Sequence, residues 1–261
     1  MDRHLAAYDR NFVKPGARGG YPHAFRRGLA FMIVAVENMY RATGDAKYRE
    51  WHTRYMRVMM YAGVTRRLPE GQQRYSFGRS STHGAYTDEV VGTSWALARA
   101  ALFTGDAQYA ALARDAMYTI GIGPDHGHGS SLGVYGHGTD GQGVNDIFDD
   151  QKWAFKAGLI LRFVRALRVV ASMPGFRHLF TLSDHDAIDR REALARAYIT
   201  TCSRTRDRGR TVEVLTCWEC GETNSETLPW VIAGLADIDS VAFTTVPSRH
   251  RQKRPEGRIE Y

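Results

Sequence analysis

The chain has 261 residues, of which 43% are hydrophobic and 24% charged, so it can bury a substantial core and is not a disordered polymer. Its formal net charge is +7, but Ser248–Tyr261 alone holds five Lys or Arg residues against two Glu, which leaves 30 basic and 26 acidic residues elsewhere. A surplus of +4 argues against a nucleic-acid-binding surface and favours an acidic substrate.

Cysteine content and hydropathy indicate in which cellular compartment the protein resides. Three cysteines make no disulfide framework for a chain of this size and fit a reducing environment. The first ten residues are charged and have no apolar core, so they do not resemble a secretory signal. The longest apolar run, Leu29–Val36, is too short to span a bilayer. We expect a cytoplasmic protein without a membrane partner, or a secreted one if a leader has been removed.

The first half of the chain predicts two helical hairpins joined by the same turn. TGDAKY at Thr43–Tyr48 recurs as TGDAQY at Thr104–Tyr109, about 61 residues later, each time between two amphipathic stretches. Gly44 suits the left-handed stop of one helix and Asp45 the N-cap of the next. Between the hairpins, Val64–Thr87 reads as a polar loop with room for a short strand pair. The predicted helices are Arg27–Ala42, Ala46–Tyr61, Asp88–Phe103 and Asp106–Ile120.

The second half predicts a third hairpin and one unpaired helix. Nine of the 23 residues in Gly121–Gly143 are glycine, which predicts no regular element there. Further on we predict helices at Phe148–Met173, Ala187–Cys202 and Glu226–Ile238, a charged turn at Ser203–Arg210 and a strand at Thr211–Cys217. Half a hairpin at the end of an array needs a cap, supplied by the tail, by another subunit of a homo-oligomer, or by the remainder of a longer ring. We expect one domain over residues 1–247 and a flexible basic tail over 248–261.

Helices with small and aromatic residues that lead into a TGD-x-x-Y turn resemble those of the (α/α) toroids of six-hairpin glycosidases and related polysaccharide lyases. The resemblance is carried by Tyr40–Tyr48, by Phe103–Tyr109 and loosely by the Trp-rich helix starts, and it covers roughly residues 20–240. It implies an all-α fold, a partial toroid of antiparallel hairpins with minor β structure in the loops. It also implies a carbohydrate substrate, bound where the inner helices begin.

Four segments precede the predicted inner helices, and each combines an aromatic residue with titratable groups. Hydrolysis of a glycosidic bond needs two carboxyl groups, one to protonate the leaving oxygen and one to activate water or act as nucleophile. The resemblance implies carboxylates at successive inner helix starts, which makes Asp88 and Asp149 the first choices. Helix capping is an equally good explanation for each of them alone. The four segments are Gly19–Gly28, Thr82–Gly92, Asn145–Trp153 and Cys217–Trp230.

A competing set of residues suits β-elimination on a uronate, as in polysaccharide lyases of the toroid type. His23 and Tyr86 would move the protons, and Arg26 would neutralise the carboxylate of the sugar. Arg79 is a second candidate for holding that carboxylate. The further substrate-binding candidates are His83, Trp153, Trp218, Glu222, Asn224 and His137.

The glycine-rich segment also carries His126, His128 and His137. A zinc site built from these histidines with Cys217 or Cys220 is a weaker alternative to a lid that presents a histidine to the substrate. A single CxxC segment is weak evidence for zinc, so we predict no metal, and no phosphate-binding glycine motif occurs, so we predict no nucleotide cofactor. Among the tryptophans, Trp95 has the spacing of a core residue, whereas Trp153, Trp218 and Trp230 lie near helix starts, where one or two could stack on sugars.

The sequence therefore predicts a carbohydrate-active enzyme that cleaves an acidic, uronate-containing oligosaccharide or polysaccharide. Hydrolysis by Asp88 and Asp149 stands slightly ahead of elimination by His23 and Tyr86. The non-enzymatic alternative is a helical-repeat scaffold that docks a protein partner on its concave surface or on its unpaired last helix.

Overall fold

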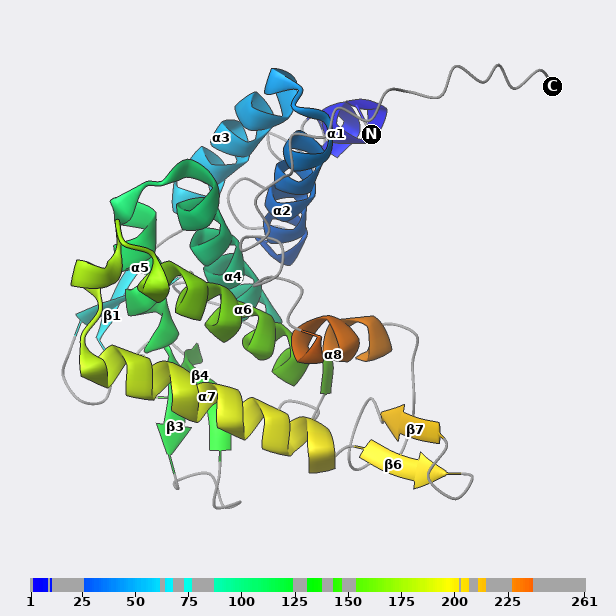
Figure 1. The fold of residues 1–261 in the computed structure, drawn as a ribbon, viewed down its shortest axis with the longest axis vertical. Helices are drawn as coiled ribbons and strands as arrows, with labels where there is room; N and C mark the ends of the chain where they lie inside the picture. The colour runs from blue at the N-terminus through cyan, green and yellow to red at the C-terminus, as the bar shows by residue number, and fades with distance from the viewer. Residues whose placement is uncertain are drawn as a thin grey trace.

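A computed structural model describes residues 2–8, 10, 26–61, 64–67, 73–76, 87–123, 131–137, 143–146, 154–201, 203–206, 211–214 and 227–236. Helices dominate this part of the chain, and they form three consecutive hairpins followed by a single helix (Figure 1). The all-α prediction is confirmed, while residues 248–261 lie outside the described ranges. The helices are α1 (Asp2–Tyr8), α2 (Arg26–Thr43), α3 (Ala46–Tyr61), α4 (Thr87–Thr104), α5 (Ala107–Met117), α6 (Ala154–Ser172), α7 (Leu182–Thr201) and α8 (Thr227–Leu235).

The two TGD turns have the same backbone conformation and the same hydrogen bonds. Gly44 and Gly105 have φ angles of 70° and 75°, in the left-handed region where glycine is favoured. The Thr43 hydroxyl donates to Met39 O at 2.7 Å, and the Thr104 hydroxyl donates to the equivalent carbonyl, Ala100 O, at 2.7 Å. Asp45 and Asp106 then accept the backbone N–H two residues further on, at 3.0 Å and 2.8 Å. The predicted Gly44 stop and Asp45 cap are confirmed, and Gly105 and Asp106 repeat them in the second hairpin.

The third hairpin turns without this motif. After Ser172 a short 3₁₀ helix, Arg177–Leu179, leads to Thr181, which exchanges hydrogen bonds with Asp184 in the manner of a capping box. Burial alone would raise the pKa of Asp184, but hydrogen bonds from Tyr118 and Thr181 outweigh it and lower that pKa. This cap starts α7 at Leu182, so the predicted start at Ala187 was five residues too late.

Short antiparallel sheets occupy the connections from each outer helix to the next inner one. The loop between the first two hairpins contains a short strand pair, for which its sequence left room. The prediction of no regular element over Gly121–Gly143 was wrong, because Ile120 and Ile122 alternate with glycine and pair with the similarly alternating β4. The charged turn predicted at Ser203–Arg210 begins instead as a strand. The strands are β1 (Val64–Arg67) with β2 (Gln73–Ser76), β3 (Ile120–Gly123) with β4 (Ser131–His137) and β5 (Gly143–Asp146), and β6 (Ser203–Arg206) with β7 (Thr211–Val214).

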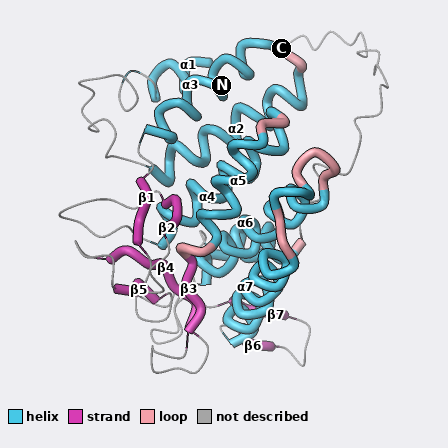
Figure 2. Tube along the Cα trace, turned by 90° about the vertical axis from the view of Figure 1, so that its left-hand side faces the viewer, coloured by secondary structure: helices cyan, strands magenta, loops and turns pink. Residues whose placement is uncertain are grey.

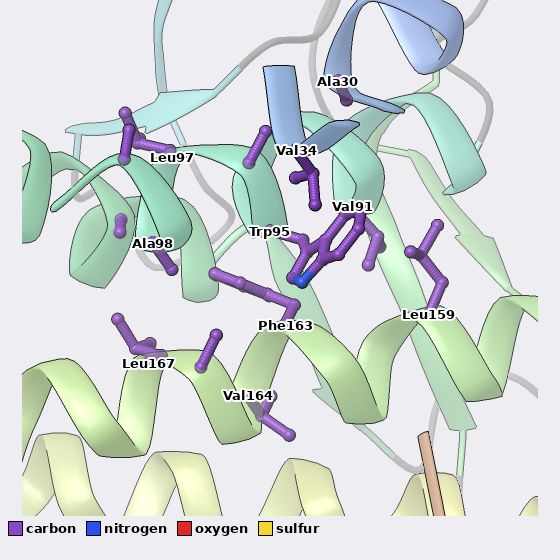
Figure 3. Packing of buried hydrophobic residues seen from close by; sticks show 14 of the residues in the cluster. Ala30, Val34, Val91, Trp95, Leu97, Ala98, Leu159, Phe163, Val164 and Leu167 are labelled. Carbon is purple, nitrogen blue, oxygen red and sulfur yellow. The ribbon is translucent and has the colours of Figure 1, made fainter. Parts of the chain in front are cut away.

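The helices form two layers. The inner layer consists of α2, α4, α6 and α8, where α4 packs between α2 and α6, and α6 also packs against α8. The outer layer consists of α3, α5 and α7, each packed on the inner helix of its own hairpin. Figure 2 shows the first two sheets gathered at one side of this helical body. The predicted core position of Trp95 is confirmed, because it is 2% exposed and lies between α2 and α6 near Val34 and Phe163 (Figure 3).

Two glycines let α6 and α8 touch backbone to backbone. A Cβ on Gly158 would lie 2.6 Å from Trp230 O, and one on Gly234 would lie 2.7 Å from Gly158 O. Arg165, a buried residue of α6, donates to the last carbonyls of α8 at Gly234 and Leu235, which satisfies a helix end that lacks its own partners. The contact thus fixes α8, although no outer helix pairs with it within the described ranges.

We expect Gly158→Ala to lower the free energy of unfolding by about 1–3 kcal/mol, because its new Cβ collides with backbone atoms that no rotamer change can move. Urea unfolding followed by tryptophan fluorescence measures the change. The matched control is Gly175→Ala, where a Cβ meets nothing within 4 Å and the backbone is not left-handed. Equal stabilities for the two variants would contradict close packing of α6 on α8.

His52 of α3 is an interior base that prefers to stay neutral. It is 1% exposed, and its Nε2 atom meets no hydrogen-bond partner in the described part of the chain. Burial, together with the nearby Arg49 guanidinium, lowers the pKa of His52 to about 4. Protonation therefore costs more in the folded state than in the unfolded chain, where the ordinary pKa near 6.5 applies.

Because the folded pKa of His52 is depressed, its contribution to stability is complete above pH 6.5 and is lost as the pH falls toward 4. We expect the free energy of unfolding to fall by about 2 kcal/mol more in the parent than in His52→Leu between pH 7.5 and pH 5. Denaturant unfolding at the two pH values measures this difference. The control is Thr53→Val at an exposed position of the same helix, which removes no ionisable group and should keep the parent's pH dependence. An unchanged pH dependence in His52→Leu would contradict the assignment.

Candidate functional site

The two ends of the hairpin array differ in how the chain crosses them. Each inner helix passes to its outer partner through a short connection, either a TGD turn or the segment between Ser172 and Leu182. Each outer helix passes to the next inner helix through a longer connection that carries a small antiparallel sheet. The sequence-predicted site residues belong to the starts of the inner helices or to the connections just before them, with His137 in the sheet between α5 and α6.

Three inner helices meet at Gly92, within their first two turns. A Cβ at this position would be 3.8 Å from Leu159 Cδ2 and 3.9 Å from Ala30 Cβ, so α2 and α6 both approach α4 here. The fourth inner helix joins through Gly158, which contacts the backbone of Trp230. The N-terminal turns of α2, α4, α6 and α8 therefore converge, as the resemblance to toroid enzymes implied.

An aromatic cluster occupies this convergence, with one ring from each of three inner helices. Phe31 and Trp230 stack with centroids 4.8 Å apart and planes inclined by 26°. Trp95 meets the edge of both rings, at 6.3 Å from Phe31 and 6.2 Å from Trp230. Trp95 is buried, whereas Phe31 and Trp230 are half-buried. The stacked pair also links the first inner helix to the last.

Arg162 of α6 adds a cation to the aromatic cluster. Its guanidinium carbon lies 4.0 Å from the centroid of Trp95 and 5.3 Å from that of Trp230, within the range of a cation–π interaction. This contact fixes the guanidinium between two indole rings. Charge and aromatic surface thus come together between two and three turns into α4 and α6.

Three further polar residues are buried near the starts of α4 and α6. Thr93 and Ser94 donate from their hydroxyls to Val90 O at 3.0 Å and 2.7 Å, which engages both hydroxyls within the helix. Lys156, the third residue of α6, is 5% exposed. Hydrogen bonds within α4 therefore account for the burial of the two hydroxyls. Burial of the Lys156 ammonium group requires an acidic neighbour to offset its lost hydration.

The structure describes the backbone of three predicted site residues. Arg26 is the first residue of α2, Asp88 the second of α4 and His137 the last of β4, which pairs with Gly143. The other predicted site residues lie outside the described ranges: His23, Arg79, His83, Tyr86, Asp149, Trp153, Trp218, Glu222 and Asn224. The candidate zinc ligands His126, His128, Cys217 and Cys220 lie outside these ranges too.

Sequence reasoning missed Phe31, Lys156 and Arg162. Each lies inside a predicted helix, where an aromatic or basic residue is read by default as core or as solvated surface. One available signal was Lys156 within the otherwise apolar run from Phe155 to Leu161. Trp230 was predicted as a residue that could stack on a sugar, but the face of its ring that stacks on Phe31 is not available for this.

Within the described ranges, no three His, Cys, Asp or Glu side chains come together as a metal-binding group. No helix in that part of the chain has both the length and the apolar character needed to cross a membrane.

The two layers of helices, joined as successive hairpins, form a partial (α/α) toroid. Among solved structures, the chain is similar to the glycoside hydrolase family 76 mannosidase Bt3792 from Bacteroides thetaiotaomicron VPI-5482, with a TM-score of 0.54 and 10% sequence identity. The match covers 82% of this chain and 53% of that one, so the chain spans about half the length of its structural neighbour. No protein-family model and no curated protein sequence match it.

Proposed function

We propose that the protein is a glycoside hydrolase that cleaves an acidic oligosaccharide or polysaccharide where its inner helices begin. The convergence of the N-terminal halves of the four inner helices around Phe31, Trp95 and Trp230 carries this proposal. Aromatic rings suit the apolar faces of sugars, and helix N-termini favour anionic groups. The glycoside-hydrolase-like fold supports the reaction class.

Asp88 and Asp149 are the proposed acid and its ionised partner. Asp88 is the second residue of α4, and Asp149 precedes the first described residue of α6 by five positions. The packing of α4 beside α6 supports a shared role for carboxyl groups at the two helix starts. Arg26, at the start of α2, and Arg79 are the proposed ligands of a substrate carboxylate.

The test incubates the protein with a panel of uronate polymers and with mannan, included because the structural neighbour is a mannosidase. Hydrolysis yields new reducing ends, whereas elimination also yields a conjugated double bond that absorbs in the ultraviolet. Reducing ends without that absorbance support the proposal. Ultraviolet absorbance would favour elimination by His23 and Tyr86, and the absence of any product would favour a helical scaffold that binds a partner.

A further inference from the structure

Lys156 is a charged group in an unusual place. It is the third residue of α6 and is only 5% exposed, near the converging starts of the inner helices. Removing an ammonium group from water costs several kcal/mol unless a carboxylate compensates for the lost hydration. The sequence offers such groups at the start of α4, where Asp88 and Glu89 are adjacent.

The packing of α4 against α6 shows which of these residues lies level with Lys156. Gly92 faces Leu159, and Trp95 faces Arg162, so in both pairs the α6 residue follows its α4 partner by 67 positions. The constant offset means that the two helices run in the same direction and in step, because both rise equally per residue. One turn toward the N-termini, the same offset places Lys156 level with Glu89.

We propose that Lys156 is a positioning residue that pairs with Glu89 and locks the start of α6 to the start of α4. This inference rests on the proposed function, because the two helix starts are those associated with Asp88 and Asp149. In a glycosidase the separation of the two carboxyl groups decides whether a water molecule fits between them. The Lys156–Glu89 pair holds the starts of α4 and α6 in register without itself touching the sugar.

The pairing is tested by stability alone, with Lys156→Met, Glu89→Gln and the double variant. Methionine keeps the length and apolar stem of lysine, so the variant remains suited to a buried site. If the two residues form one pair, the double variant melts at or above the temperature of the less stable single variant, because the second change removes the charge that the first left unpaired. Additive losses of melting temperature would overturn the pairing.

The positioning role is tested on the polymer that the parent cleaves. Lys156→Met is expected to lower kcat about tenfold or more while KM stays within about twofold, and Lys156→Arg is expected to restore most of the rate. The control is Lys47→Met, which removes an ion pair with Asp2 beside the first TGD turn and leaves kcat unchanged. An unchanged kcat in Lys156→Met would overturn the positioning role. A parent that cleaves no polymer defeats the proposed function, whereas the melting temperatures still decide the pairing.

Discussion

Asp88→Asn and Asp149→Asn are each expected to lower kcat/KM by about a thousandfold, because asparagine can neither donate nor accept the proton that bond cleavage requires. Rates of reducing-end release at saturating and at low substrate concentration measure the loss. The explanation by helix capping makes the opposite prediction. Asparagine caps a helix about as well as aspartate, so a capping residue tolerates this change with little loss.

The matched control for these variants is Asp106→Asn in the second TGD turn. Asp106 caps α5 through a 2.8 Å hydrogen bond from the Gln108 N–H, so its role is that of a cap. We expect this variant to keep both its stability and its kcat/KM. A loss of activity in Asp106→Asn equal to that in Asp88→Asn would show that the effect is not local to the inner helix starts.

Arg99→Met is expected to destabilise the fold by about 3–5 kcal/mol, because the buried carboxylate of Glu37 then loses one of its two guanidinium partners. Glu37 of α2 is 0% exposed and accepts from Arg99 Nη2 at 2.9 Å and from Arg41 Nε at 3.1 Å. Burial raises the pKa of Glu37, while the guanidinium groups of Arg99 and Arg41 oppose the rise. The free energy of unfolding from urea titration measures the loss.

Removing both charges separates the cost of an orphaned carboxylate from the value of the ion pair. We expect the double variant Glu37→Met with Arg99→Met to recover most of the stability lost in Arg99→Met, because buried ion pairs gain little over apolar contacts of similar volume. A double variant less stable than Arg99→Met would show that the pair itself holds α2 against α4.

Local chemistry explains why the hairpins were predictable from sequence. In each TGD turn, a threonine hydroxyl, a glycine at positive φ and an aspartate cap act within six residues, so the motif specifies its own conformation. The glycine-rich segment was mispredicted because its strands are defined by partners in other strands. The register Ile120↔Val134 joins residues that single-sequence patterns treat separately.

The candidate site was only partly predictable, for a related reason. The segments before the inner helices could be identified, since a helical hairpin fixes which of its ends meet. The contacts that bring those ends together are tertiary. Phe31 meets Trp230 across about 200 residues of chain, and a missing Cβ at Gly158 sets how close α8 approaches. Neither relation leaves a pattern within one helix.

The central claim is that substrate binds where the four inner helices begin. Hydrogen exchange measured by mass spectrometry on Asp88→Asn, with and without the polymer that the parent cleaves, tests it most directly. The account predicts slower exchange on binding in peptides that cover the starts of α2, α4, α6 and α8, with no change at the two TGD turns. Protection confined to the TGD turns or to the outer helices would contradict it.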